Sequence, residues 1–279
     1  MKRDEGEAAE RRPAAHRTPR ARKRFGQHFL ADPGVLERIV EALDPGPGAT
    51  VVEIGPGRGA LTDRLAARAA RVIAVEIDRD LVALLRERYA EQGSVRVVEG
   101  DALKVDWAAL AGGPYRLAGN LPYYITTPLL FRALQPPRPE RSVVLVQREV
   151  ADRIVAAPGS KTYGALSVNV QLVAHAEIVA RVPAASFRPR PSVDSAVVRL
   201  LPRVHPLLSD DEAAPLRHFI QGIFGFRRKQ MVRVLRELRG VDADAARRVL
   251  SAAAVAPDVR PETLPPDAFL RLFRALGAT

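Results

Sequence analysis

The sequence predicts an α/β fold in which a parallel, doubly wound sheet is followed by a small all-helical domain. Three observations predict it. Short apolar runs alternate with helix-period segments from residue 50 onward, and this alternation is typical of βαβ units. The first strand-to-helix turn is rich in glycine. After residue 203, the chain contains only helical patterns.

The expected strands are short apolar runs that end at turn residues or at a helix-period segment. They are TVVEI (50–54), VIAVEI (72–77), VRVVEG (95–100), YRLAGN (115–120), SVVLVQ (142–147), AEIVARV (176–182) and SAVVRLL (195–201). Helices are expected at 60–69, 79–92, 127–134, 148–161, 163–173, 214–225, 229–238, 243–253 and 266–276. We therefore expect an α/β domain over 25–203 and a helical domain over 204–279, joined by the proline-containing acidic segment 202–212.

Composition narrows the class of protein. The chain has 279 residues, 47% of them hydrophobic, and no cysteine, so disulfides, thiolate metal ligands and cysteine nucleophiles are excluded. No apolar run approaches the ~20 residues that a membrane helix needs, and the charged N-terminus has no apolar signal segment. We therefore expect a soluble, cytoplasmic, monomeric protein that binds no metal.

The positive charge favours a nucleic-acid partner. The formal net charge is +11, and all but five of the 43 basic residues are arginines, whose guanidinium groups pair with phosphates and stack on bases. An arginine-favouring genome would explain the ratio of arginine to lysine but not the net charge. Residues 1–24 carry nine basic and four acidic side chains, so this segment is expected to be disordered. It is either a phosphate-binding tail or a solvated extension.

The glycine-rich turn EIGPGRGAL (53–61) predicts a nucleotide-like ligand. Gly55 and Gly57 permit tight backbone geometry and close ligand approach, and the next helix offers free N–H groups. The turn also fits a dinucleotide fingerprint, with Glu76 placed where an acid would bind a ribose. The turn alone therefore does not choose between a nicotinamide cofactor and S-adenosylmethionine (SAM).

Three neighbouring features favour SAM. Glu53 stands two residues before Gly55 and gives the E-x-G-x-G-x-G form seen in class I SAM methyltransferases. Asp101 closes the third strand, where its carboxylate could accept a hydrogen bond from an adenine amine. The fourth strand ends in Asn120-Leu121-Pro122-Tyr123. Because these features follow successive strand ends, they should meet at the edge where open α/β sheets bind ligands.

The turn GNLPYYIT (119–126) suits methylation of the exocyclic amine of a base. The Asn120 side-chain oxygen and the Leu121 carbonyl can each accept one N–H, which favours a pyramidal nitrogen whose lone pair points at the methyl group. Pro122 stiffens the turn. Tyr123 offers a ring face, and stacking on a base is worth ~1–3 kcal/mol. Tyr124 has no evident role here and is expected to lie in the core.

Together these motifs resemble the KsgA-type ribosomal RNA adenine dimethyltransferases. The resemblance runs from residue 23 almost to the C-terminus, through KRFGQHFL (23–30), VEIGPGRGALT (52–62), VEID (75–78), EGDAL (99–103), NLPYYIT (120–126), QREVADRI (147–154), PGSKTYGALSV (158–168), FRPRPSVDSAVVRL (187–200) and FGFRRKQM (224–231). It implies a class I SAM-methyltransferase fold. It also implies transfer of two methyl groups to each of two adjacent adenosines near the 3′ end of small-subunit rRNA.

The resemblance also implies particular contacts. SAM contacts are implied at His28, Leu30, Gly55, Glu76, Asp101 and Asn120, with His28 standing where the family often has asparagine. Phe187 could face Tyr123 across a flipped adenine, although a core phenylalanine gives the same pattern. Lys229, Arg233 and Arg236 share one helix face beside Arg227 and Arg228, and this face suits RNA phosphates.

Two alternatives remain open on the sequence. An Erm-type large-subunit rRNA methyltransferase shares the glycine loop and the Asn-Leu-Pro-Tyr type of turn, although such enzymes more often have isoleucine before the proline. A non-catalytic RNA-binding assembly factor could also use this fold.

Overall fold

The computed structural model describes residues 22, 26–204 and 207–277. The strands are β1 (Phe29–Leu30), β2 (Thr50–Ile54), β3 (Arg71–Glu76), β4 (Val95–Glu99), β5 (Arg116–Asn120), β6 (Arg141–Gln147), β7 (Ala174–Val182), β8 (Phe187–Arg188) and β9 (Ser195–Pro202). The α-helices are α1 (Pro33–Leu43), α2 (Ala60–Ala66), α3 (Arg79–Arg88), α4 (Trp107–Ala111), α5 (Thr126–Ala133), α6 (Arg148–Ile154), α7 (Ala165–Val173), α8 (Asp210–Phe224), α9 (Met231–Arg239), α10 (Ala243–Ala252) and α11 (Pro266–Gly277). Short 3₁₀ helices are η2 (Tyr123–Ile125), η3 (Ala184–Ser186) and η4 (Pro261–Thr263).

One seven-stranded sheet forms the centre of the molecule, in the order β4-β3-β2-β5-β6-β9-β7. Strands β2 to β6 pair in parallel, whereas β9 pairs antiparallel with both of its neighbours. The expected parallel pairing is confirmed for β2 to β6, and the reversed direction of β9 was not predicted. The segment between β7 and β9 contains only η3 and β8, and without a crossover helix the chain turns back antiparallel.

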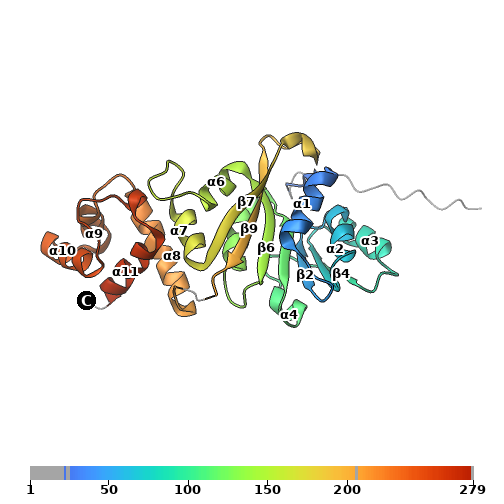
Figure 1. Ribbon diagram of the computed structural model, residues 1–279, viewed down its shortest axis with the longest axis horizontal. Helices are drawn as coiled ribbons and strands as arrows, with labels where there is room; N and C mark the ends of the chain where they lie inside the picture. The colour runs from blue at the N-terminus through green and yellow to red at the C-terminus, as the bar shows by residue number, and fades with distance from the viewer. Residues whose placement is uncertain (1–21, 23–25, 205–206, 278–279) are drawn as a thin grey trace, which may run out of the picture.

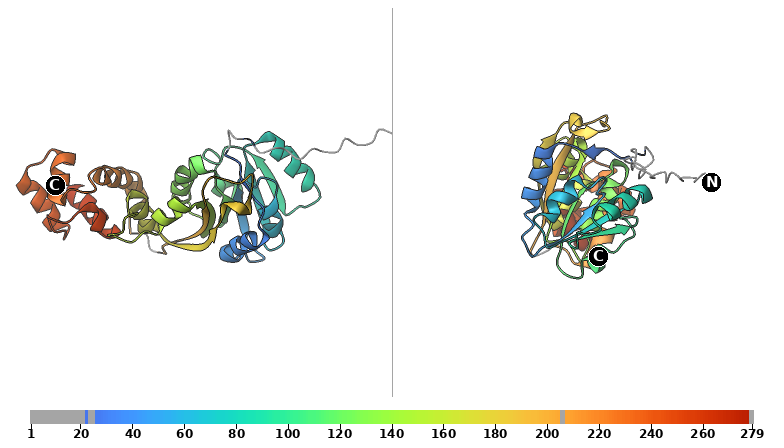
Figure 2. Two further views of the ribbon diagram at one scale, coloured as in Figure 1. Left: turned by 90° about the horizontal axis from the view of Figure 1, so that it is seen from above. Right: turned by 90° about the vertical axis from the view of Figure 1, so that its right-hand side faces the viewer.

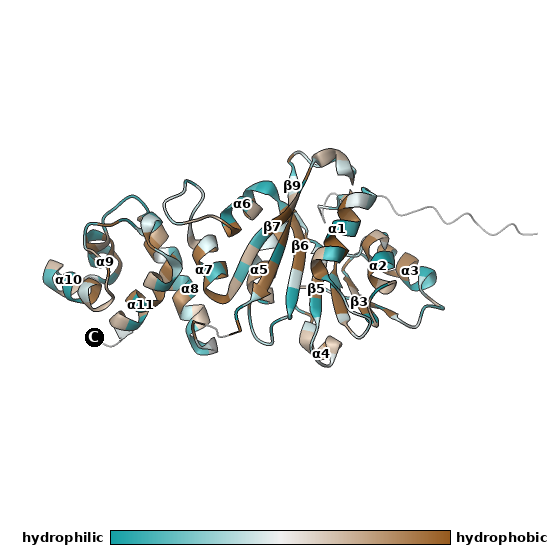
Figure 3. Ribbon diagram, in the orientation of Figure 1, coloured by the Kyte–Doolittle hydropathy of each residue, from teal (hydrophilic) through white to brown (hydrophobic). Residues whose placement is uncertain are grey.

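Helices cover both faces of the sheet (Figures 1 and 2). Successive residues of β2 enter different clusters, because neighbouring side chains of a strand point to opposite faces. Val51 belongs to the cluster that contains residues of α1 and α2, and Val52 belongs to the one that contains residues of α4, α5 and α7. Apolar residues accordingly line the strands between the helix layers (Figure 3). The sheet is buried on both sides, as a doubly wound fold requires.

Helix α1 was not expected from the sequence, although its signals are present. Asp32 caps it by accepting hydrogen bonds from the N–H groups of Gly34 (2.9 Å) and Val35 (3.3 Å), and Pro33 occupies its first turn. Conversely, the helix expected over 148–161 is shorter, since α6 ends at Ile154.

Residues after β9 form a helical lobe at one end of an elongated molecule (Figures 1 and 2). The lobe packs on α7, and one hydrophobic cluster runs from the sheet into it. Tyr163, just before α7, is fully buried, and its hydroxyl donates to the Leu264 carbonyl (2.8 Å). Its ring meets Phe224 edge-on at 6.1 Å. The two halves therefore share core residues.

The N-terminal segment 1–24 lies outside the described residues except for Arg22. This arginine donates to Asp78 (3.0 Å) and also pairs with Asp80. Among residues 22, 26–204 and 207–277, no helix is long and apolar enough to cross a membrane. The same part of the chain contains no group of three or more His, Cys, Asp or Glu residues arranged to hold a metal ion.

Candidate active site

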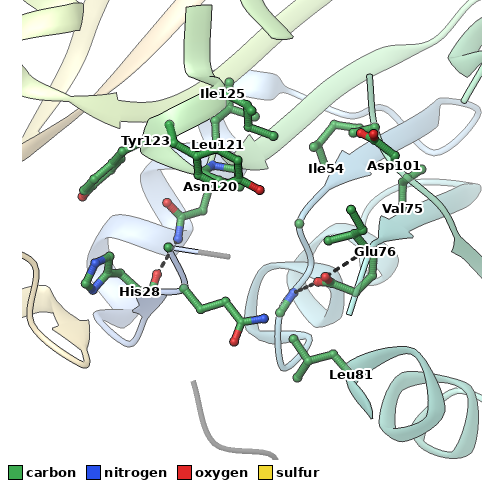
Figure 4. Close-up of a pocket in the computed structure, with 18 of the residues that line it drawn as sticks. His28, Ile54, Val75, Glu76, Leu81, Asp101, Asn120, Leu121, Tyr123 and Ile125 are labelled. Atoms are coloured by element: carbon green, nitrogen blue, oxygen red, sulfur yellow. Dashed lines mark hydrogen bonds between the residues drawn. The ribbon is translucent and has the colours of Figure 1, made fainter. Parts of the chain in front are cut away.

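A cleft opens at the carboxyl ends of β2, β3, β4 and β5 (Figure 4). It encloses about 940 Å³ of empty space, open solvent at its mouth included. The strand order places β3 on one side of β2 and β5 on the other. The cleft therefore lies at the topological switch point of the sheet, which is the usual ligand position in such folds. In Figure 4, Asn120, Tyr123 and His28 lie on one side and Glu76 and Asp101 on the other.

The glycine turn after β2 forms the floor of the cleft. Gly55 and Gly57 both line the cleft and have positive φ angles of 68° and 59°, which side chains rarely tolerate. A Cβ atom on Gly57 would lie 2.9 Å from Cδ1 of Phe29. The backbone can approach a ligand closely here because both positions lack side chains.

Glu76, the last residue of β3, is held by backbone N–H groups. Its carboxylate accepts from Gly57 (3.2 Å), Ile77 (2.9 Å) and Asp78 (3.0 Å). Burial raises the pKa of Glu76, while these backbone donors oppose the rise. The acid therefore faces the glycine turn and lines the cleft.

The far wall combines an acid with an exposed apolar residue. Asp101 lines the cleft, and its carboxylate accepts from the N–H of Leu103 (2.9 Å). Ile77 also lines the cleft and is 43% exposed, which is unusual for a large apolar side chain. An exposed isoleucine beside two acids suits the face of an adenine ring. Sequence reasoning did not find Ile77, because it looks like the end of a strand.

Asn120 is oriented by its own amide. Its Nδ2 donates to the His28 carbonyl oxygen (2.7 Å). Because a carbonyl can only accept, this bond must use the amide nitrogen, and Oδ1 remains available as an acceptor. The N–H of Leu121 donates to the Leu145 carbonyl (3.1 Å), which ties the turn to β6. Within the described residues, no donor reaches the Leu121 carbonyl oxygen. The turn thus presents two free acceptors.

Tyr123 is held both by its backbone and by its side-chain hydroxyl. Pro122 precedes it with φ −57°, and its hydroxyl lies 2.7 Å from the Ser195 hydroxyl. Its ring stacks on His28, with centroids 5.8 Å apart and 25° between the planes. Burial raises the pKa of the Tyr123 hydroxyl, and the bond to Ser195 opposes the rise. Sequence reasoning missed Ser195 because it reads only as the start of a strand.

The expected role of Phe187 is not supported by the structure. Phe187 pairs with Leu30 across the β1–β8 ladder, and both side chains are buried against α1. Phe187 is fully buried and does not line the cleft. The ring that faces Tyr123 is His28. A cofactor contact by the Leu30 side chain is likewise not seen, because that side chain points into the core.

Two further expectations are corrected. Glu53 is 1% exposed and accepts from the Thr62 hydroxyl (2.6 Å), so it joins β2 to α2 behind the glycine turn instead of lining the cleft. Burial raises its pKa to about 8. Tyr124 was expected in the core, but it is 59% exposed and lines the cleft.

A second, basic groove lies where the two halves of the molecule meet. Its lining includes five cationic side chains and one acid: Lys161, Arg227, Arg228, Lys229, Arg260 and Glu262. Lys161 and Arg260 were not anticipated, because they lie far from the RRK segment in the sequence. They come from the α6–α7 loop and from the residue before η4.

The expected RNA-binding residues differ in whether they already have hydrogen-bond or ion-pair partners within the protein. Arg227 donates to Glu262 (2.7 Å) and to the carbonyls of Ser160 (3.2 Å) and Lys161 (2.8 Å), so it links the two halves. Lys229 and Arg233 both bond Glu237. Within the described part of the chain, Arg228 and Arg236 form no ion pair, although the charge of Arg236 helps to lower the pKa of Asp242. Of these two, only Arg228 lines the groove.

The fold and the cleft together define a class of protein. A seven-stranded sheet with one reversed strand, a glycine turn after β2 and two free acceptors in an Asn-Leu-Pro-Tyr turn after β5 are the parts of a SAM-dependent methyltransferase that acts on a base amine. The sequence profile of the ribosomal RNA adenine dimethylases matches residues 18–277. The chain belongs to this family.

Relatives and solved structures agree with this assignment. Proteins called ribosomal RNA small subunit methyltransferase A are 43% identical in Moorella thermoacetica (91% of this chain, 92% of the relative) and 47% identical in Synechococcus sp. strain JA-3-3Ab (88% and 89%). A dimethyladenosine transferase from Plasmodium falciparum superposes with a TM-score of 0.78 at 27% identity (90% and 98% covered). The 23S rRNA methyltransferase ErmE gives a TM-score of 0.69 at 30% identity (89% and 99% covered).

Proposed function

We propose that this enzyme transfers methyl groups from SAM to the N6 amines of two adjacent adenosines near the 3′ end of small-subunit (16S) rRNA. The products are N6,N6-dimethyladenosines, formed during ribosome biogenesis in the cytoplasm. The observation that carries the reaction is the pair of free acceptors at Asn120 and Leu121 beside the ring of Tyr123. The small-subunit assignment rests on the names of the relatives.

The cleft suits SAM on its own geometry. The glycine turn gives backbone access at Gly55 and Gly57, and a Cβ at Gly57 would collide with Phe29. Glu76, Ile77 and Asp101 all line the cleft, and in this proposal Glu76 binds the ribose hydroxyls while Ile77 and Asp101 contact the face and the amine of the adenine. When bound, SAM supplies the electrophilic methyl group.

The chain's own residues prepare the accepting nitrogen. The target adenine lies on Tyr123, and in the first transfer its N6 amine donates one N–H to Asn120 Oδ1 and the other to the Leu121 carbonyl. In each transfer the bond from the methyl group to the sulfonium breaks as the new bond to N6 forms, and the displaced N6 proton leaves to solvent. In the second transfer the monomethylated amine has one N–H left to donate. Both acceptors are immobile, since His28 holds the Asn120 amide and Leu145 holds the Leu121 backbone. Holding the lone pair in line with the methyl group lowers the entropic part of the barrier, and fixed dipoles stabilise the developing positive charge on nitrogen.

The RNA is held at a second location in this proposal. The helical half, 204–279, acts as an RNA-binding domain beside the methyltransferase domain, 25–203. Lys161, Arg228 and Arg260 in the basic groove contact phosphates directly, and Arg227, Lys229, Arg233 and Arg236 add positive charge around it. Each phosphate contact releases condensed counterions, so binding should weaken steeply with salt. The enzyme is proposed to act as a monomer.

The test uses small subunits from cells that lack the enzyme, incubated with labelled SAM, followed by mapping of the labelled bases. We expect label at two adjacent adenosines near the 3′ end of the small-subunit rRNA. Asn120→Ala should lower the methylation rate at least about a hundredfold, because it removes one of two acceptors made for the transition state, while RNA affinity stays nearly unchanged. Label in large-subunit RNA would support the Erm-type alternative. Full methylation by Asn120→Ala would refute the mechanism.

A further inference from the structure

Tyr124 lines the same cleft as its neighbour Tyr123 but has a different exposure and different partners. Tyr123 is half-buried, bonded to Ser195 and stacked on His28. Tyr124 lines the same cleft but is 59% exposed. Within the described residues, its hydroxyl has no hydrogen-bond partner and its ring has no aromatic or cationic neighbour.

The ring of Tyr124 lies beside Gly26. A Cβ atom on Gly26, whose φ is 58°, would lie 3.6 Å from Cδ1 and 3.9 Å from Cε1 of Tyr124, so the ring lies next to a position without a side chain. Both tyrosines belong to η2. Successive side chains of a 3₁₀ helix point about 120° apart, so the two rings diverge from one turn.

Exposed aromatic rings are rare in the described part of this chain. The large hydrophobic side chains with high exposure are Ile77, Tyr124, Val193, Val204 and Leu207, and Tyr124 is the sole aromatic among them. Its position at the mouth of the cleft is where RNA flanking a target base would pass.

We propose that the Tyr124 ring is a stacking platform for the nucleobase adjacent to the adenosine being methylated. The proposal rests on the proposed function and deepens it by adding a second base subsite. The two target adenosines are neighbours, so when one lies on Tyr123, the other offers a purine face to Tyr124. A free hydroxyl fits this role, because stacking uses the face of the ring and not its oxygen.

Loss of the Tyr124 ring is expected to weaken RNA binding without changing cofactor binding or the chemical step. Loss of the ring should raise KM for the small subunit about tenfold, within the roughly 5- to 150-fold that one base–aromatic stack is worth. The value of kcat and the Kd for SAM should stay within about twofold, since Tyr124 holds neither reacting atom.

The experiment compares Tyr124→Ala, Tyr124→Leu and Tyr124→Phe on under-methylated small subunits, with SAM affinity measured by calorimetry. We expect Ala and Leu to raise KM, because Leu keeps the apolar volume but has no π face, and Phe to restore it. Val204→Ala is the matched control, as Val204 is an exposed apolar residue outside the cleft. Melting temperatures verify that all variants are folded.

Three outcomes would overturn the proposal. The first is an unchanged KM for the small subunit in Tyr124→Ala, and the second is a KM that Leu restores as well as Phe does. The third is a Kd for SAM that rises by the same factor as KM, which would place Tyr124 in the cofactor site. Each differs from failure of the proposed function, in which the wild-type enzyme itself would leave the small-subunit adenosines unmethylated.

Discussion

The bond between Tyr123 and Ser195 joins residues 72 positions apart at 2.7 Å. Ser195 is fully buried at the start of β9, so it holds the Tyr123 hydroxyl from a rigid element. The bond fixes the tilt of the Tyr123 ring, on which we propose that the adenine stacks, and an ordinary hydrogen bond is worth about 1 kcal/mol.

Ser195→Ala should therefore lower kcat/KM for small-subunit methylation about five- to tenfold, with no change in SAM affinity. Tyr123→Phe should have an effect of similar size, since it removes the other half of the same bond. The double variant should be no worse than either single variant. Effects that add in the double variant would show that the two residues act separately.

Glu53 makes stability depend on pH. Burial raises its pKa from 4.5 to about 8, so the folded protein holds a proton that the unfolded chain releases above about pH 4.5. The folded state therefore binds more protons across this window, and stability falls as pH rises through it, by at most about 1.4 kcal/mol per pH unit.

The variant Glu53→Gln keeps an acceptor for Thr62 but cannot ionise. Its melting temperature should match that of the wild type near pH 5 and exceed it near pH 8, where the wild type holds a buried carboxylate. Differential scanning calorimetry from pH 5 to pH 9 checks this. Equal slopes in both proteins would contradict it. SAM affinity should persist, because Glu53 acts behind the glycine turn.

At the scale of elements, three segments build the basic groove. The α6–α7 loop gives Lys161, the α8–α9 loop gives Arg228, and the residue before η4 is Arg260. The same segments are joined by Arg227 and Glu262, and the N–H of Gly159 donates to the Glu262 carbonyl (2.7 Å). On the α8–α9 loop, Arg227 therefore connects the two halves, whereas its neighbour Arg228 is proposed to contact RNA.

Arg228→Ala should weaken small-subunit binding and reduce the slope of log Kd against log salt by about one, without lowering the melting temperature. Arg227→Ala should lower the melting temperature instead, since it leaves the Glu262 carboxylate and the Lys161 carbonyl without a donor. Arg247→Ala, an exposed arginine of α10 outside the groove, is the matched control. Equal effects of Arg228→Ala and Arg247→Ala on the salt slope would rule out a local phosphate contact.

The sequence predicted most of the main elements but missed helix α1 and the smallest strands. Strands such as β2 and β6 are continuous apolar runs, so their pattern is plain. β1 and β8 have two residues each, too few for any period. This is why Phe187 was ambiguous: its side chain faces the core because of its pairing with Leu30, a contact that no local pattern encodes.

Most of the cleft was predictable because its residues end successive strands of one sheet. Glu76, Asp101, Asn120 and Tyr123 all line it. Arg227 in the basic groove and Ser195 at the start of β9 were harder to interpret, because their roles depend on distant partners. Arg227 looked like a free cation, but its acid lies 35 residues later in the chain, and Ser195 became relevant only once β9 reached Tyr123.

At the scale of the whole molecule, one hydrophobic cluster joins the two halves. Trp107 of α4 and Phe269 of α11 belong to the same cluster, and Tyr163 inserts between the halves. The chain should therefore unfold in one transition, with fluorescence of Trp107, the single tryptophan, coinciding with loss of helical circular dichroism.

Tyr163→Ala should cost about 3–5 kcal/mol of unfolding free energy, and Tyr163→Phe about 1 kcal/mol, because only the bond to Leu264 is lost. Denaturant titrations with both probes measure these values. Two separate transitions in the wild type would show that the halves fold independently despite the shared cluster.

Strand β9 runs from Ser195, beside the ring of Tyr123, to Pro202, shortly before α8. Eight strand residues span about 25 Å, and β9 is hydrogen-bonded on both sides by β6 and β7. A rigid backbone therefore sets the distance from the ring of Tyr123 to the end of the strand. Under the proposed function, this fixed distance would make methylation depend on the spacing between the target adenosines and the RNA segment that the helical half contacts.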